Sequence, residues 1–170
     1  MIRSFLAGAG DAGGFGCSGV DLRSRLPISA MDGIGGNDIW LVKPQSYMNH
    51  SGPPVRGMLD YYRLRPTQLL VAHDEIDLPP GTVRIKDGGG HGGHNGIRDV
   101  IRHCGPDFLR LRLGVGHPGE KDKVTNYVLK RGPSDTEAAI ERNIDETIAV
   151  MPELVEGDVN AAMKKLHTRD

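Results

Sequence analysis

Residues 88–96, GGGHGGHNG, place His91, His94 and Asn95 on a backbone made almost entirely of glycine. Backbone N–H groups at the start of a helix attract anions, and glycines let a phosphate approach closely. The stretch lacks the G-K-S/T that completes a P-loop. Asn95 is suited to cap the helix that follows, or to contact a ligand at its start, and the two roles are compatible.

A second polar group, HDEID at residues 73–77, follows the apolar run LLVA. Open α/β sheets place ligands at the carboxyl ends of their strands. Asp74 could orient a nearby imidazole there, or it could belong to a solvated turn. For Glu75 and Asp77 we favour the solvated turn.

A third group, PQSYMNHSG, contains Asn49, whose amide could hold a water molecule or polarise a carbonyl. Asn49 could equally serve only as a helix cap. Ser46 and Ser51 lie nearby, but the sequence has no G-x-S-x-G, so nothing marks either serine as a nucleophile.

The histidines leave a metal-dependent hydrolase open as an alternative. His73, Asp74, His91, His94 and His117 offer nitrogen and oxygen ligands. There is neither an H-E-x-x-H motif nor a cysteine pair, so we expect no metal.

Basic residues alternate along two expected strands. Arg84 and Lys86 share one strand face, and Arg110 and Arg112 share another. Together with Tyr47, these side chains could bind phosphates and stack a base of single-stranded RNA. A solvated polar face is the simpler interpretation of each residue alone.

The whole chain fits one soluble domain. It has 170 residues, of which 38% are hydrophobic and 25% charged, with a net charge of −1. An RNA partner must therefore meet a local basic patch. Two cysteines, no secretion signal and no long apolar run predict a cytoplasmic protein without a membrane span.

Hydrophobic patterns predict the elements that position these groups. Residues 8–36 are rich in glycine and predict loop. Ile140, Ile144 and Ile148 follow a capping box at residues 134–137 on one stripe. Strands are expected at residues 2–7, 38–43, 69–73, 82–86 and 109–116, and helices from 53, from 97, from 134 and at 158–166. The alternation predicts an α/β fold with a mixed central sheet flanked by helices, in one domain spanning 1–170.

From about residue 38 to the C-terminus, the chain resembles bacterial-type peptidyl-tRNA hydrolase. The matching segments are LVKPQSYMNHSG, LLVAHDEIDLPPGTVRIKDGGGHGGHNGIRDVI and LRLRLGVGHPGEKDKVTNYVL. The resemblance implies a monomeric α/β enzyme without metal or cofactor. The activity that the resemblance implies is hydrolysis of the ester between a peptide and the 3′ end of tRNA, which recycles tRNA from stalled translation.

The resemblance also assigns roles to individual residues. Asp74 looks like the aspartate that orients the family's catalytic histidine, and Asn95 like the asparagine that positions water and peptide, with His94 beside it. Asn49 looks like the substrate-binding asparagine, and Tyr47 like the aromatic that contacts the tRNA 3′ end. The remaining matches, at the family's tRNA phosphate contacts, are Lys86 and Arg112.

The first 37 residues depart from the family's pattern, and we expect them to be divergent or truncated. Asp11 and Ala12 stand where the family has asparagine and proline, and no histidine precedes His50. His50, His73 and His94 are not expected to replace the missing base, since their motif positions already have other places in the fold. The missing base, typically worth about 10²–10⁴-fold in rate, leaves an impaired protein that binds the tRNA acceptor end as an alternative. An incomplete N-terminal region would also expose an apolar face and favour self-association.

Overall fold

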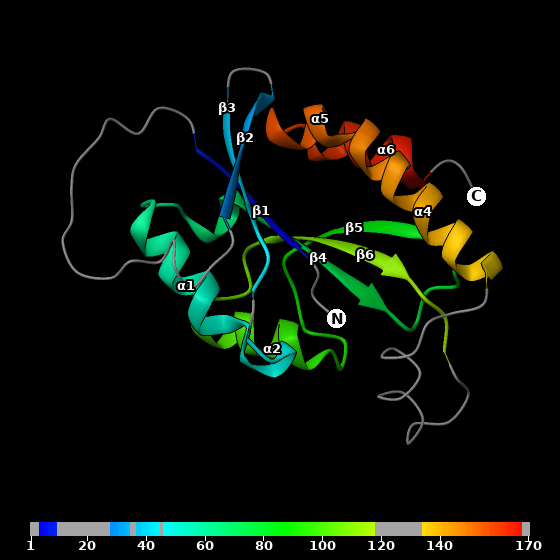
Figure 1. Ribbon diagram of the computed structural model, residues 1–170, viewed down its shortest axis with the longest axis horizontal. Coiled ribbons are helices and arrows are strands. Elements are labelled where there is room, and N and C mark those ends of the chain that lie inside the picture. Colours follow the sequence, from blue (N-terminus) through cyan, green and yellow to red (C-terminus); the bar gives the residue numbers. More distant parts are fainter. Residues whose placement is uncertain (1–3, 10–27, 35–36, 45, 118–133, 168–170) are drawn as a thin grey trace. The chain divides into compact units, whose positions relative to one another are not determined.

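The computed structural model describes residues 4–9, 28–34, 37–44, 46–117 and 134–167 (Figure 1). Its contacts divide the chain into two compact units. We call residues 2–71 with 87–109 the helix-pair unit, and residues 72–86 with 110 onward the C-terminal unit. The α/β fold is confirmed. The expectation of one domain stays a prediction.

Three strands of the helix-pair unit form antiparallel pairs. β3 (Asn37–Val42) pairs with β1 (Ser4–Ala9) and with β2 (Ile28–Ile34). The first residues of β4 (Leu69–Glu75) follow β1 in the hydrogen-bonded order. The prediction of loop throughout residues 8–36 is therefore wrong for β2, whose ladder has an irregularity between Met31 and Ile34.

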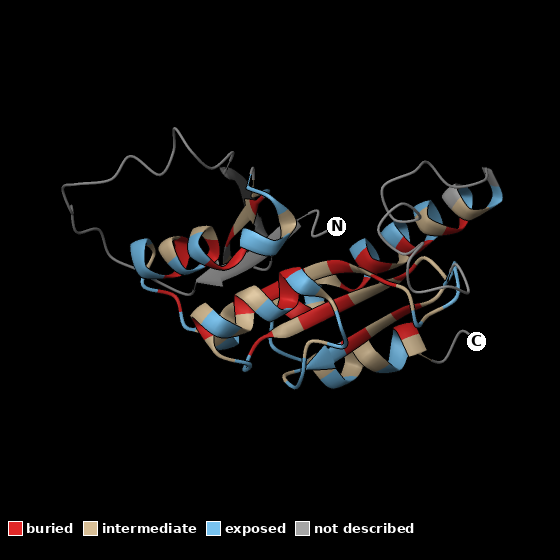
Figure 2. Cartoon of the chain, turned by 90° about the horizontal axis from the view of Figure 1, so that it is seen from below, coloured by how far each residue is buried: buried red, intermediate tan, exposed pale blue. Residues whose placement is uncertain are grey.

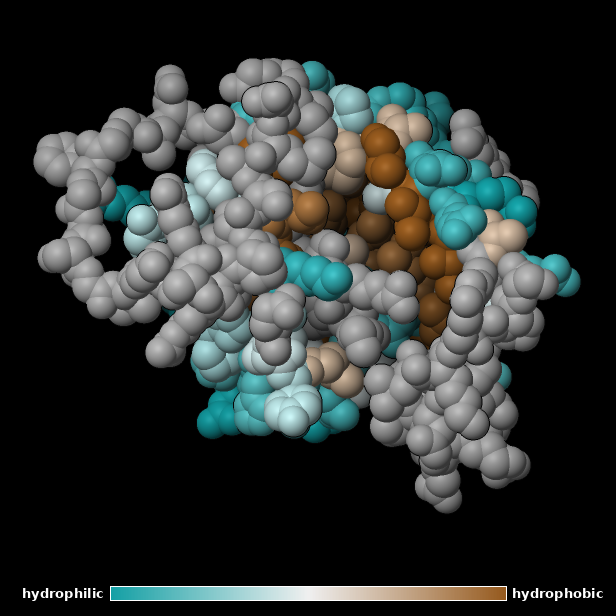
Figure 3. Space-filling view, viewed as in Figure 1, coloured by the Kyte–Doolittle hydropathy of each residue, from teal (hydrophilic) through white to brown (hydrophobic). Residues whose placement is uncertain are grey.

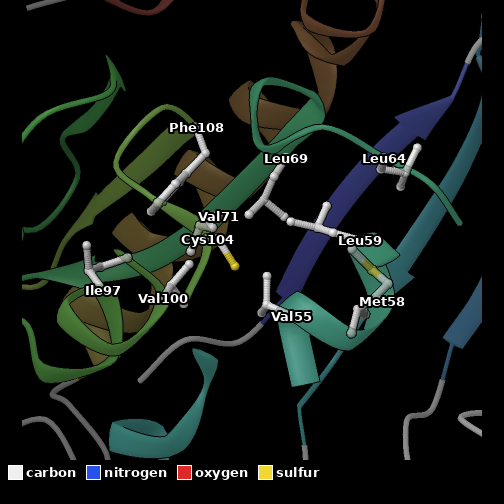
Figure 4. Packing of buried hydrophobic residues seen from close by; sticks show 11 residues of the cluster. Val55, Met58, Leu59, Leu64, Leu69, Val71, Ile97, Val100, Cys104 and Phe108 are labelled. Atoms are coloured by element: carbon white, nitrogen blue, oxygen red, sulfur yellow. The ribbon is translucent and has the colours of Figure 1, made fainter. Parts of the chain in front are cut away.

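The two helices that give this unit its name pack against each other. α1 (Gly52–Tyr61) and α2 (Asn95–Cys104) each bury one side and expose the other (Figure 2). Gly105 ends α2 with a positive φ of 81°, as its sequence predicts. The side chains between the helices and neighbouring segments form one hydrophobic cluster (Figure 4). Its members are Val42, Val55, Met58, Leu59, Leu64, Leu69, Val71, Ile97, Val100, Cys104 and Phe108.

Two short 3₁₀ turns also lie among the described residues of the helix-pair unit. η2 (Met48–His50) leads directly into α1 and contacts α2. η3 (Pro66–Gln68) leads into β4. The turn that carries Asn49 thus lies against the helix that Asn95 begins.

In the described part of the C-terminal unit, three strands are followed by three consecutive helices. Its strand order is β4, then β6 (Leu109–Gly114), then β5 (Val83–Asp87). α4 (Ser134–Ala149), α5 (Met151–Val155) and α6 (Val159–His167) follow one another, and each contacts the next (Figure 1). The expected helix at 158–166 is matched by α6, whereas α5 has no apolar period long enough to predict it.

The buried face of α4 is not the face that carries the stripe of isoleucines. Ile144 and Ile148 are 43% and 61% exposed, and a hydrophobic band runs along one side of α4 in Figure 3. The helix instead buries a neighbouring stripe of mostly smaller side chains, continued by the residue just after its end. That stripe consists of Ala139, Asn143, Thr147 and Val150.

No helix in the described part of the chain is long and apolar enough to cross a membrane. Cys104 lies buried in the hydrophobic cluster, and this burial raises the pKa of its thiol to about 11. Since only the thiolate is a strong nucleophile, Cys104 serves the core and not the chemistry. Cys17 lies outside the described residues.

Candidate functional site

The glycine loop needs glycine for its backbone conformation. Gly88, Gly89, Gly92 and Gly93 have φ values of 59°, 89°, 55° and 82°, a region that side chains disfavour. A Cβ atom added at Gly92 or Gly93 would meet nothing within 4 Å, so crowding is not the reason. The loop therefore presents a bare, largely exposed backbone directly before α2.

His94, and not Asn95, caps α2. Nδ1 of His94 accepts the Ile97 N–H at 3.2 Å, and the His94 carbonyl accepts the Arg98 N–H at 3.0 Å. The cap interpretation of Asn95 is therefore wrong, because Asn95 is the first residue inside the helix. Its exposed side chain is not needed to begin α2.

Backbone hydrogen bonds hold the turn that carries Asn49. The Ser46 hydroxyl donates to the His50 carbonyl at 2.9 Å, and the Ser51 hydroxyl donates to the Met48 carbonyl at 2.7 Å. Both serines thus stabilise the turn, in keeping with the absence of a nucleophile motif. Asn49 is exposed.

The structure brings Tyr47, Asn49, His94 and Asn95 into one unit. The first two flank the start of η2, the last two begin α2, and η2 contacts α2. Tyr47 is 83% exposed. Exposed amides and a phenol ring on packed helices can donate hydrogen bonds to a carbonyl and stack on a base.

Asp74, the predicted carboxylate, lies half-exposed on β4 in the C-terminal unit. His73 beside it is buried, and its Nδ1 lies 2.8 Å from the Asp74 carbonyl oxygen. A carbonyl only accepts, so this ring nitrogen carries a proton. A buried, hydrogen-bonded His73 fits the expectation that it does not replace the base. The grouping of Asp74 with the two amides stays a prediction.

Glu75 is buried, so its interpretation as part of a solvated turn is wrong. Its carboxylate binds Nε of Arg112 at 2.9 Å and accepts the Asp77 N–H at 3.3 Å. The physical reason is that β4 and β6 are neighbours, which brings the two side chains together. Asp77 itself is exposed, as predicted.

The predicted basic patch is smaller than the sequence suggests. Arg110 is only 2% exposed. Burial, and then the charge of Arg112, lower the pKa of Arg110. On β5, Lys86 is exposed and Arg84 half-exposed. The phosphate-binding roles of Lys86 and Arg112 stay predictions, and Arg112 already has the carboxylate of Glu75 as a partner.

Among the residues that the structure describes, no three His, Cys, Asp or Glu side chains are arranged to hold a metal ion. In the glycine loop, Nδ1 of His91 accepts the Gly93 N–H at 3.0 Å, and Nδ1 of His94 is the helix cap. When one nitrogen of a neutral imidazole accepts a hydrogen bond, the other nitrogen carries the proton. In this state, neither His91 nor His94 has a ring lone pair left for a metal. His117 is exposed.

Comparisons with known proteins point to one family. Residues 20–170 match the family model described as peptidyl-tRNA hydrolase. A peptidyl-tRNA hydrolase of Coxiella burnetii is 48% identical over 133 residues, which are 78% of this chain and 71% of that protein. One of Pseudomonas entomophila is 49% identical over 134 residues, covering 78% and 69%. The crystal structure of peptidyl-tRNA hydrolase from Acinetobacter baumannii is similar with a TM-score of 0.78 at 40% identity, covering 85% of this chain and 80% of that one.

Proposed function

Because the chain belongs to the peptidyl-tRNA hydrolase family, we propose that it hydrolyses the ester between a peptide and the 3′ end of tRNA. The observation that carries the proposal for this chain's own residues is the exposed pair Asn49 and Asn95 in one packed unit. In this reaction, the oxygen of water attacks the ester carbonyl carbon and the bond to the ribose oxygen breaks. The products are a free peptide carboxylate, a proton and tRNA with a free hydroxyl.

The two amides supply the polar contacts of this reaction. An amide N–H that points to the carbonyl oxygen stabilises the negative charge that develops when water attacks, and the amide carbonyl of a second residue accepts a proton of the attacking water. Asp74 belongs to the system that receives the proton. In a catalytic triad, such a carboxylate orients the base and stabilises the positive charge that the base gains with the proton.

Recognition of tRNA rests on the acceptor end. The exposed ring of Tyr47 offers a face on which a base can stack. Lys86 contributes positive charge toward phosphates, and the guanidinium of Arg112 offers N–H donors besides the Nε that binds Glu75. We place this activity in a cytoplasmic monomer that needs neither metal nor cofactor.

Single-turnover release of tRNA from an N-acetyl-aminoacyl-tRNA tests the proposal. We expect EDTA-resistant hydrolysis, with a loss of about 10²–10³-fold in rate for Asn95→Ala. Asn160→Ala removes an equally exposed amide from α6 and serves as the matched control. Turnover at the uncatalysed rate, together with salt-sensitive tRNA binding, would instead establish the alternative of an impaired acceptor-end binder. Activity that chelation removes and zinc restores would establish the metal-dependent alternative.

A further inference from the structure

The start of α1 is held by a residue from α2. Pro53 and Pro54 have no backbone N–H, so Gly52 carries the one N–H group among the first three residues of α1. Ser51 makes no side-chain cap hydrogen bond to α1, and its hydroxyl donates to the Met48 carbonyl. The Gly52 N–H instead donates to the carboxylate of Asp99 at 2.7 Å.

The contact around this hydrogen bond is close. Gly52 is buried, and the side chain of Asp99 is only 13% exposed. A Cβ atom at Gly52 would overlap both the His103 imidazole and the Asp99 carbonyl oxygen. His103 Nδ1 donates to that carbonyl oxygen at 2.8 Å. Glycine is therefore required for this approach of α1 to α2.

Electrostatics strengthens the bond. The N-terminus of α1 carries a partial positive charge, and α1 has no acidic residue in its own first turn. The Asp99 carboxylate supplies the missing negative charge, and charge-assisted hydrogen bonds are stronger than neutral ones.

The spacing connects this bond to the two amides. Asn49 lies three residues before Gly52, and Asn95 lies four residues, about one helical turn, before Asp99. A shift of α1 along α2 would therefore move one amide relative to the other. We propose that Asp99 is a positioning residue that fixes Asn49 relative to Asn95, an inference that rests on the proposed function of these amides.

The test compares Asp99→Ala with Asp99→Asn. The asparagine oxygen still accepts the Gly52 N–H, whereas alanine cannot. Asp60→Ala is the control, because Asp60 also lies on α1 and its exposed carboxylate binds Arg56 on the surface. We would record the side-chain amide NMR signals of Asn49 and Asn95, and the affinity for a peptide joined through a non-hydrolysable amide to the 3′ terminal adenosine of an acceptor-stem RNA.

We expect Asp99→Ala to shift the side-chain signals of both asparagines and to weaken binding about tenfold. Asp99→Asn should restore most of the affinity, and Asp60→Ala should match the wild type. Unchanged signals and affinity in Asp99→Ala, or an Asp99→Asn variant as weak as alanine, would overturn the proposal.

Hydrogen exchange in the wild type provides a test that does not depend on how a variant folds. The Gly52 amide should be strongly protected, and exchange as fast as in an open chain would overturn the proposal. If the wild type fails to bind or cleave any tRNA analogue, the proposed function fails. The Gly52 exchange and the asparagine signals would still decide the role of Asp99.

Discussion

The helix-pair unit and the C-terminal unit use their polar side chains in opposite ways. In the helix-pair unit, Asn49 on η2 and Asn95 at the start of α2 are exposed, and the two elements contact each other. In the C-terminal unit, Glu75 is buried and bound to Arg112, and Arg110 is buried beside them on the same strand as Arg112. Exposed groups on packed elements are available to a substrate, whereas a buried carboxylate bound in an ion pair is committed to the fold. We therefore expect substitutions in the first set to change turnover and substitutions in the second to change stability.

Removing the buried carboxylate has the largest expected effect on stability. Glu75→Ala leaves Arg112 without its partner and should lower the free energy of unfolding by about 3 kcal/mol. Urea unfolding measures this loss. Asp77→Ala, which removes an exposed carboxylate two residues away, should cost little. A loss below about 1 kcal/mol in Glu75→Ala would show that the pair contributes no more than a surface contact.

Substitutions in the glycine loop should change the free energy of unfolding through backbone conformation and not through crowding. Gly93→Ala places a side chain at a φ of 82° and should cost about 1 kcal/mol. Gly90→Ala is the matched control, since its φ is not in that region and a Cβ atom there meets nothing within 4 Å. Equal unfolding free energies for the two variants would contradict this account of the loop.

A pH-dependent contact joins α6 to β5. Nε2 of His167 accepts the Ile85 N–H at 3.1 Å, and burial, followed by the charge of Arg84, lowers the pKa of His167 below 6.5. The unfolded chain therefore binds a proton more readily, and this stabilisation is present above pH 6.5 and lost as the pH falls through the folded pKa. Because the ring is partly exposed, we expect the loss to be small.

His167→Gln separates this effect from general acid unfolding. The glutamine oxygen can still accept the Ile85 N–H but does not titrate. Unfolding measured at pH 7.5 and again near pH 5 should therefore change less in the variant than in the wild type. The same change in both proteins would remove His167 from the pH dependence.

The isoleucines of α4 should have the smallest effect. Ile148 is 61% exposed, so Ile148→Ala should change the free energy of unfolding by less than about 0.5 kcal/mol. Val150, which is 3% exposed, provides the contrast, and Val150→Ala should cost about 2 kcal/mol. A larger loss for Ile148→Ala than for Val150→Ala would mean that the isoleucine stripe, and not its neighbour, is the inner face.

The sequence predicts those elements whose apolar residues repeat with a clear period. Val55, Met58 and Leu59 mark the inner face of α1, and all three are buried. β2 was not predictable, because ISAMDGI neither alternates nor forms an apolar run, and only its pairing with β3 defines it. The face of α4 was not predictable from hydrophobicity, since small and polar side chains fill the inner stripe.

Candidate site residues could be named from motifs, but not their partners. Asn49 and Asn95 stand in short, specific motifs. The Glu75–Arg112 pair and the Asp99–Gly52 bond join residues 37 and 47 positions apart. No local sequence pattern predicts such contacts, because they depend on which strands and helices become neighbours.

The central claim is that Asn49 and Asn95 together contact the substrate. The most direct measurement is an NMR titration of the wild type with the non-hydrolysable 3′-end analogue, following the side-chain amides of Asn49, Asn95 and Asn160. We predict that the signals of Asn49 and Asn95 shift together at the same analogue concentration while that of Asn160 stays in place. If the analogue binds and neither Asn49 nor Asn95 responds, the two amides do not form the site.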